Sequence, residues 1–398
     1  IVWHRSFHEL YMNDAAMSMA GIDPAQIRPG MQIDIEQGHF FEVGLGFAIN
    51  RLNPWILAPE KYAQGLQRLK EVVHHGGHTS IGDLATGLFN FDTEAQALAE
   101  QLEGDDVPFR TRLVVHGTRL TQGGRKPEEG PAMADALQSH NSHRLSFAQH
   151  IKLFSDGAFF SQLAQMQEPG YIDGHHGEWL AAPEELERHI RAYWQAGYQI
   201  HVHVTGDLGL ELTLDILQKM QDEKPRFHHG FTFEHFGFST PEQIRRIKAL
   251  GAQVSANVYY LHELSDSYAK TGIGYERASQ MARLRSCFDA GINTTIHSDF
   301  TMAPAEPLNS MWVAVTRQNH AGDVMGSEER LTQQQALEAI TINAAHTIGL
   351  ADITGSLRAG KRADFTVLNQ DPLTCEPSAL RDINIAATVF EGKVFPIE

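Results

Sequence analysis

The sequence has little cysteine and no long apolar run. Its two cysteines, Cys287 and Cys375, are too few for a disulfide framework or for a zinc site made of thiolates. This usage is typical of a reducing compartment, and we therefore expect a cytoplasmic protein. No run of about 18 apolar residues occurs, so the sequence predicts no membrane-spanning helix and no membrane partner.

Basic residues are also in the minority. The 49 acidic residues outnumber the 32 lysines and arginines, and the formal net charge is −17. Because nucleic-acid binding needs clustered Lys and Arg, we expect no nucleic-acid partner, although a cationic pocket within an acidic surface is compatible with this charge. The apolar and charged fractions, 42% and 20%, are typical of a soluble globular enzyme. We expect a small-molecule substrate as its partner, and the sequence leaves open whether the chain forms a homo-oligomer.

Short strand-like segments alternate with amphipathic helical segments along most of the chain. This alternation predicts an α/β fold, either a doubly wound sheet or a barrel. No GxGxxG follows any of the strands, so the dinucleotide-binding version of a doubly wound sheet lacks its signature. The predicted strands are 79–85, 110–116, 148–156, 198–207, 231–236, 252–260 and 292–299. The clearest helices are 183–197 and 241–251, each with Pro in its first turn and Gly at its end.

Seven strands are one fewer than a closed (β/α)8 barrel needs. Residues 1–70 have the pattern of loops and helices, with helical segments at 14–21 and 59–77. The chain also starts with Ile1 rather than Met, so we expect a processed or truncated start and a first barrel strand upstream of it. After Asp299 the spacing changes: a helix over 331–350 precedes short strands with tight Gly turns, which predict a small β-structure packed against the barrel.

Histidine is abundant, with 22 residues, roughly twice the ordinary usage. His203, His235 and Asp299 stand at or near the ends of predicted strands, where a barrel gathers its functional side chains. Imidazoles and a carboxylate are suitable ligands for zinc and similar ions. Lys152 is also at a strand end, and it fits such a site if its amine is carboxylated to an anionic carbamate that bridges two metals. Asp299 could then accept a proton from metal-bound water.

Each of these residues has a plainer interpretation when it is taken alone. A single His at a strand end is more often a hydrogen-bonded core residue than a ligand. Lys152 could simply extend its amine to the barrel mouth, and Asp156 could fix the turn before Gly157. The order of the set along the strands is what favours a metal site.

Several motifs in this order resemble the YtcJ-like branch of the amidohydrolase superfamily, which includes N-substituted formamide deformylases. The resemblance implies a (β/α)8 barrel over 1–350 that lacks its first strand here, and part of a flanking β-sandwich over 351–398. The matching segments are NDAAMSMAGI at 13–22, IKLFSDGAF at 151–159, HVTGD at 203–207, FEH at 233–235, HSDF at 297–300, LTQQQALEAITINAAHTIGL at 331–350, GSLRAGKRADFTVLNQDPL at 355–373 and AATVFEGKVF at 386–395.

The resemblance also implies roles for individual residues. Lys152 would be the carboxylated bridging lysine, His203 and His235 metal ligands, and Asp299 a ligand and proton shuttle, around one or two divalent ions, expected to be zinc. Phe300 stands where the branch often has a bulky pocket residue, and we take it together with Asp156 as a substrate-binding candidate.

One family motif, the HxH at the end of the first barrel strand, is absent. His201 and His203 form an HVH pair, but on the strand that would be the fifth. An N-terminal truncation explains the absence. The sequence as a whole predicts a metal-dependent hydrolase of an amide or formamide-like C–N bond. The alternatives are a lyase, decarboxylase or esterase that uses the same site, or a truncated, metal-poor remnant without turnover.

Overall fold

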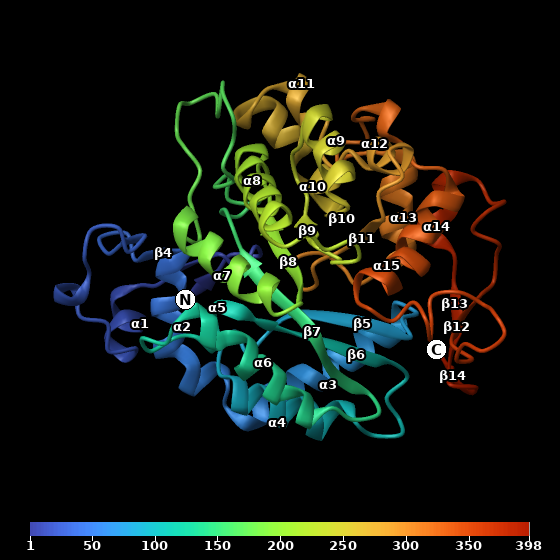
Figure 1. The fold of residues 1–398 in the computed structure, drawn as a ribbon, viewed down its shortest axis with the longest axis horizontal. Helices are drawn as coiled ribbons and strands as arrows, with labels where there is room; N and C mark the ends of the chain where they lie inside the picture. Colours follow the sequence, from blue (N-terminus) through green and yellow to red (C-terminus); the bar gives the residue numbers. More distant parts are fainter. Residues whose placement is uncertain (398) are drawn as a thin grey trace.

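The computed structural model describes residues 1–397, and its centre is a curled parallel sheet of seven strands (Figure 1). The strands follow one another in chain order, and each pairs in parallel with the next. Parallel neighbours need a crossover after each strand, which is the repeating unit of a βα barrel. The strands are β5 (Ser80–Thr86), β6 (Arg110–His116), β7 (Leu145–Phe154), β8 (Gln199–Val204), β9 (Thr232–His235), β10 (Gln253–Asn257) and β11 (Thr294–His297).

All seven segments predicted as strands form strands, and β6 covers the predicted residues 110–116. The α/β class is therefore confirmed, and the sheet has the course of a half-barrel. Within residues 1–397, β5 and β11 do not pair with each other, so the sheet is open between them. The strand that we predict upstream of Ile1 stays a prediction.

The two clearest predicted helices form as α7 (Pro183–Gln195) and α9 (Pro241–Leu250). Both have Pro and acidic residues in the first turn, which suits the exposed N–H groups at a helix N-terminus. In α9 a capping box joins Thr240 and Gln243, and the helix ends at Gly251 with a left-handed φ of 71°. Other helices of this region are α4 (Phe91–Leu102), α5 (Gly117–Leu120), α6 (Gly130–Leu137), α8 (Asp207–Glu223), α10 (Tyr259–Ser267), α11 (Tyr275–Ala278), α12 (Leu284–Asp289) and α13 (Pro307–Thr316).

Strand β8 shows that the inner face of the sheet is polar. Its aliphatic residues are buried in the main hydrophobic core: Ile200, Val202 and Val204. The alternate residues His201 and His203 point to the opposite face, because successive strand residues face opposite sides. Strand register aligns His201 with Lys152 of β7 and His203 with Glu234 of β9. The interior of the half-barrel is thus lined with groups that can carry chemistry.

The N-terminal region differs from the predicted loops and helices, because it contains a small four-stranded antiparallel sheet in the order β1-β2-β4-β3. The prediction is wrong here since strands of two or three residues are too short to show an alternating pattern. The sheet and helix α2 (Val43–Ile56) enclose a separate small core. The strands are β1 (Val2–Trp3), β2 (Glu9–Tyr11), β3 (Ile33–Asp34) and β4 (His39–Phe41), and the predicted helices form as α1 (Asp14–Met19) and α3 (Pro59–His75).

The C-terminal region contains the predicted small β-structure. Strands β12 (Phe365–Leu368), β13 (Ile385–Phe390) and β14 (Lys393–Pro396) form a three-stranded antiparallel sheet. The helix predicted over 331–350 is divided at Thr341 into α14 (Gln333–Ile340) and α15 (Ile342–Thr347). A search of the described residues finds no helix with the length and apolar character that crossing a bilayer requires.

Candidate metal centre

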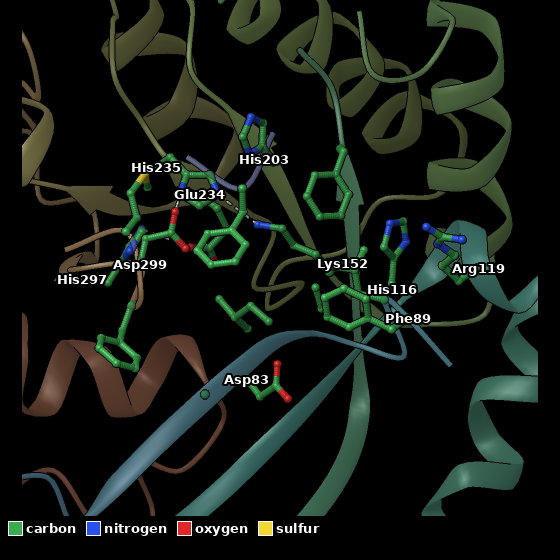
Figure 2. A pocket seen from close by; sticks show the side chains of 18 of the residues that line it. Asp83, Phe89, His116, Arg119, Lys152, His203, Glu234, His235, His297 and Asp299 are labelled. Atoms are coloured by element: carbon green, nitrogen blue, oxygen red, sulfur yellow. Dashed lines mark hydrogen bonds and ion pairs between the residues drawn. The ribbon is translucent and has the colours of Figure 1, made fainter. Parts of the chain in front are cut away.

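The residues predicted to bind metal lie together at the carboxyl ends of the parallel strands (Figure 2). Lys152 belongs to β7 and His203 to β8. His235 is the last residue of β9, and Asp299 follows β11 by two residues. Because the carboxyl ends of neighbouring parallel strands face the same side of a barrel, four segments far apart in sequence meet at one mouth.

His235 lies at the centre of this group. Its Nε2 is 3.4 Å from Nζ of Lys152, and its Nδ1 is 3.5 Å from Oδ2 of Asp299. Its ring centroid is 4.5 Å from that of His203. The structure therefore brings all four predicted residues into one cluster.

The backbone at the strand ends turns two of these side chains into the cavity. Glu234 and His235 are consecutive, and in a regular strand they would face opposite sides. Both line the same cavity, since the backbone of His235 is left-handed with a φ of 72°. Asp299 also has a left-handed backbone, with a φ of 54°. Such non-glycine residues store strain of about 1–3 kcal/mol each and concentrate at functional sites.

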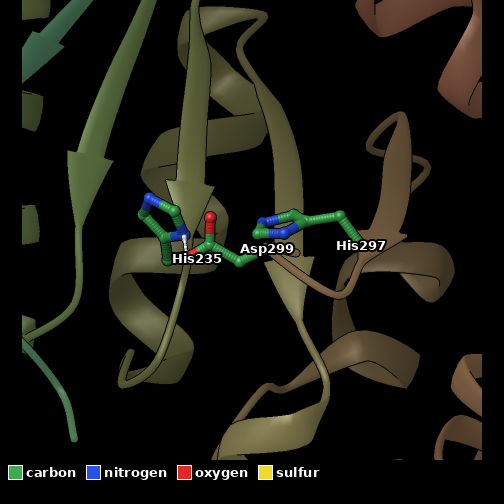
Figure 3. Close-up of side chains that lie close together, drawn as sticks. All are labelled: His235, His297 and Asp299. Atoms are coloured by element: carbon green, nitrogen blue, oxygen red, sulfur yellow. Dashed lines mark ion pairs between the residues drawn. The ribbon is translucent and has the colours of Figure 1, made fainter. Parts of the chain in front are cut away.

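Two residues of the same cluster, His297 and Glu234, were missed by the sequence analysis. Ligand atoms of His235, His297 and Asp299 all lie within 4.8 Å of one another (Figure 3). Oε2 of Glu234 is 4.0 Å from Nε2 of His297. Glu234 stands in the motif FEH and His297 in the motif HSDF, so these motifs could have identified both residues.

Several ligand-type atoms in this cluster have no hydrogen-bond partner within residues 1–397. They are buried and belong to different residues: His203 Nε2, Glu234 Oε2, His235 Nδ1 and His297 Nε2. Because the large majority of buried polar atoms in proteins are hydrogen-bonded, a group of orphaned atoms in one place needs an explanation. Imidazole nitrogens and carboxylate oxygens are the donor set that zinc and similar ions take, so these residues fit a divalent cation.

The protonation states of the cluster agree with this fit. Burial lowers the pKa of His203, His235 and His297, which keeps their rings neutral and their lone pairs available to a metal. Burial also lowers the pKa of Lys152, although Glu234 and Asp299 oppose the shift. A lysine with a lowered pKa exposes the neutral amine that reacts with carbon dioxide.

Glu234 is held in place by a chain of histidines on the polar inner face of the sheet. Its Oε1 lies 2.6 Å from Nδ1 of His201, and Nε2 of His201 lies 3.1 Å from Nδ1 of His150. Burial alone would raise the pKa of Glu234, but the hydrogen bond from His201 and the charges near it lower the pKa to about 2. The carboxylate therefore stays ionised, with Oε1 fixed and Oε2 directed at the cavity.

The N-terminal sheet reaches the centre through His8. Its ring centroid is 5.2 Å from that of His203, and its Nδ1 is 2.7 Å from Oε2 of Glu42. The Glu42 side chain is fully buried, and its Oε1 accepts a hydrogen bond of 2.8 Å from the backbone N–H of Ala158. His8 and Glu42 thus connect this sheet to the loop after β7.

Asp156 does not line the cavity. It is fully buried and accepts hydrogen bonds from the backbone N–H groups of Gln165, Thr205 and Gly206, at 2.9, 3.0 and 2.8 Å. Burial raises its pKa to about 7, against the effect of these bonds. The geometry favours the role of fixing the loop before Gly157 over contact with a substrate.

Phe300 lines a cavity of about 1500 Å³ that opens beside the cluster, and the ring is 42% exposed. Lys152, His203, His235 and Asp299 line the same cavity. Its size is sufficient for a small organic substrate. Phe300 is therefore the one substrate-binding candidate from the sequence that stands at the cavity.

A family model described as the amidohydrolase family matches residues 1–396. The chain belongs to the amidohydrolase family.

Known proteins with similar sequences carry related names. An N-substituted formamide deformylase of Arthrobacter pascens is 27% identical over 247 residues, which are 61% of this chain and 44% of that protein. The putative amidohydrolase YtcJ of Bacillus subtilis is 25% identical over 328 residues, 80% of this chain and 58% of that protein. The chain thus spans about half the length of these curated relatives.

The fold also matches a solved structure. A metal-dependent hydrolase of Pyrococcus horikoshii superposes with a TM-score of 0.72 at 22% sequence identity, over 93% of this chain and 71% of that one. At this identity the likeness shows the fold alone. It supports the half-barrel with its antiparallel additions as an amidohydrolase architecture.

Proposed function

We propose that this chain forms the metal-binding part of a hydrolase that cleaves a C–N bond of an amide or formamide-like substrate. The observation that carries the proposal is the group of buried, unpartnered ligand atoms on His203, Glu234, His235 and His297. Within residues 1–397 these atoms are buried and lack a hydrogen-bond partner, and a bound divalent ion would supply one. The name of the Arthrobacter pascens relative supports the choice of formamides as the first substrates to test.

His203, His235 and Asp299 would hold the ion, and Lys152 would join them once its amine is carboxylated to a carbamate. Carboxylation joins the Lys152 amine to carbon dioxide with loss of one proton, and burial of this lysine favours the neutral amine that reacts. A divalent ion such as zinc, when bound, would polarise the substrate carbonyl and lower the pKa of water.

Asp299 is the residue we propose for proton transfer. Its side chain is 40% exposed, and its Oδ2 lies 3.5 Å from Nδ1 of His235. A carboxylate in this position can accept a proton from the attacking water and deliver it to the leaving nitrogen. Phe300 next to it would pack against the substrate and limit the entry of solvent.

The bounds of the two domains and the location of the protein are part of the same proposal. We assign residues 1–350 to the catalytic barrel and 351–398 to the flanking β-structure, with the substrate as a small molecule. The cytoplasm is the location that the cysteine usage favours.

The experiment that tests the proposal measures formate release from a panel of N-substituted formamides by the zinc-loaded chain. We expect turnover by the unaltered chain and a loss of at least about 100-fold for Asp299→Asn, since the amide cannot take the proton. Esterase activity on matched formate esters, with no formamide turnover, would contradict cleavage of the C–N bond.

A further inference from the structure

The cavity has a second charged region at the carboxyl end of β6. His116 is the last residue of β6 and is aligned by register with Lys152, and Arg119 follows three residues later in α5. In the sheet order, β6 lies on the opposite side of β7 from β9 and β11. Figure 2 shows Arg119 and His116 on the side of Lys152 that faces away from His235 and Asp299.

The guanidinium of Arg119 has no carboxylate partner among residues 1–397. It is half-buried and makes one side-chain hydrogen bond, of 3.4 Å, to Oε1 of Gln122. The acid that acts on it electrostatically is Glu94, but the Glu94 oxygens already accept bonds from three backbone N–H groups: Gly87, Phe89 and Asn90. Burial lowers the pKa of Arg119, as expected for a cation that lacks a close partner.

Two other arginines, both buried, are fully engaged. Arg317 donates to the carbonyl oxygens of Met325, Ala282, Ser279 and Met281. Arg110 forms ion pairs with Asp364 and Glu391. A guanidinium has five N–H donors, and leaving most of them idle in a half-buried place is costly unless a ligand uses them. Arg119 differs from these two arginines because its free donors face a cavity.

More positive charge surrounds this end of the cavity. Arg125 and Lys126 of the loop after α5, and Arg188 of α7, line it and are exposed. None of the three forms an ion pair within the described part of the chain, and Glu185 is the acidic residue of α7 that lines the cavity with them. A chain with a net charge of −17 therefore concentrates unpaired cations beside its candidate metal centre.

We propose that Arg119 binds a carboxylate of the substrate while the scissile C–N bond lies at the metal centre. This inference rests on the proposed function, because it assigns the substrate class of the same cavity: amides or formamides that carry a carboxylate, such as N-acylated amino acids. A guanidinium pairs with a carboxylate through two parallel hydrogen bonds, which orients the ligand as well as holding it. Arg125, Lys126 and Arg188 add attraction at longer range.

The test compares two probes of the same shape by isothermal titration calorimetry: N-formyl-L-phenylalanine and its neutral amide. Both are titrated into the 398-residue chain, once with chelator present and once loaded with zinc. We expect the acid to bind about tenfold more tightly than the amide under both conditions, since a charge-assisted hydrogen bond is lost with the amide. Arg119→Gln should reduce this ratio to about one, and Arg119→Lys should keep part of it.

The matched control is Arg245→Gln, which removes an exposed arginine of α9 that pairs with Glu242. It should leave the ratio unchanged, and an equal loss there would show that net charge rather than Arg119 produces the preference. Equal affinities for the two probes, or no binding of the acid, overturn the inference. If Arg119→Gln fails to fold, Arg119→Lys takes its place: a ratio as large as that of the unaltered chain would contradict the assignment to Arg119. If the chain takes up no added zinc but still prefers the acid, the proposed function fails and the carboxylate site stands.

Discussion

The two walls of the cavity present opposite kinds of unpaired groups. On the wall of β8, β9 and β11, the free atoms are lone pairs of His203, Glu234, His235 and His297. On the wall of β6 and α5, the groups without a partner among residues 1–397 are N–H donors of Arg119. Lys152 of β7 stands between the two walls (Figure 2).

This difference shows how one cavity can bind a cation on one wall and an anion on the other. Unpaired lone pairs attract a cation, and unpaired cationic donors attract an anion. A substrate with an amide at one end and a carboxylate at the other matches both walls at once. The strand order keeps the two regions apart, because β6 and β9 are separated by β7 and β8.

The largest expected effect comes from the central ligand. His235→Asn should lower zinc affinity by about 100-fold or more, since even the loss of groups behind a ligand costs roughly 10–100-fold. Isothermal titration with zinc measures the change. His176→Asn, which alters an exposed histidine away from the cluster, is the control and should bind zinc as the unaltered chain does. Similar losses of zinc affinity in the two variants would show that the clustered histidines bind zinc no better than an exposed histidine does.

Asp156 does not line the cavity, so its substitution should affect the stability of the fold rather than substrate binding. Asp156→Asn places an amide against backbone N–H donors of Gln165, Thr205 and Gly206, and we expect unfolding to be easier by about 3 kcal/mol. Urea unfolding measures this change, with the exposed Asp222→Asn as a control. Substrate affinity should change less than about twofold in the variant that remains folded. A large loss of substrate affinity with unchanged stability would instead indicate that Asp156 contacts the substrate.

His116 on the β6 wall should make stability depend on pH. Burial, with Arg119 and Lys152 nearby, lowers its pKa from 6.5 to about 3, so the unfolded chain takes up the proton first. The stability that it contributes is complete above about pH 6.5 and declines as the pH falls toward 3, by about 1.4 kcal/mol per pH unit. His116→Gln should make the decline between pH 6.5 and 4 shallower by about 1 kcal/mol per pH unit. Parallel urea-unfolding profiles for the two proteins would show that His116 is not responsible.

The parallel strands and four members of the centre were predictable from sequence for a physical reason. Alternating elements fix where strands end, and the carboxyl ends of barrel strands meet, so Lys152, His203, His235 and Asp299 could be grouped without coordinates. His297 could have been added, because it is the last residue of β11 and lies two residues before Asp299. The prediction uses His235 of FEH and Asp299 and Phe300 of HSDF, and it leaves out Glu234 and His297.

Other features depend on contacts that a pattern does not carry. Glu234 faces the cavity together with His235 because the backbone turns at φ 72°, which strand alternation does not predict. The strands near the N-terminus are shorter than any detectable period. The position of Arg119 at the cavity, with the nearby Glu94 bonded to backbone N–H groups, depends on such contacts.

The metal content of the chain tests the proposed centre most directly. Elemental analysis is made on protein purified without chelator and with bicarbonate present, for the unaltered chain and for His235→Asn. We predict at least one equivalent of zinc or a similar divalent ion per unaltered chain, with a second equivalent if carboxylated Lys152 bridges two ions, and much less in the variant. A folded, unaltered chain that holds no metal, and takes up none from added zinc, would contradict the metal centre.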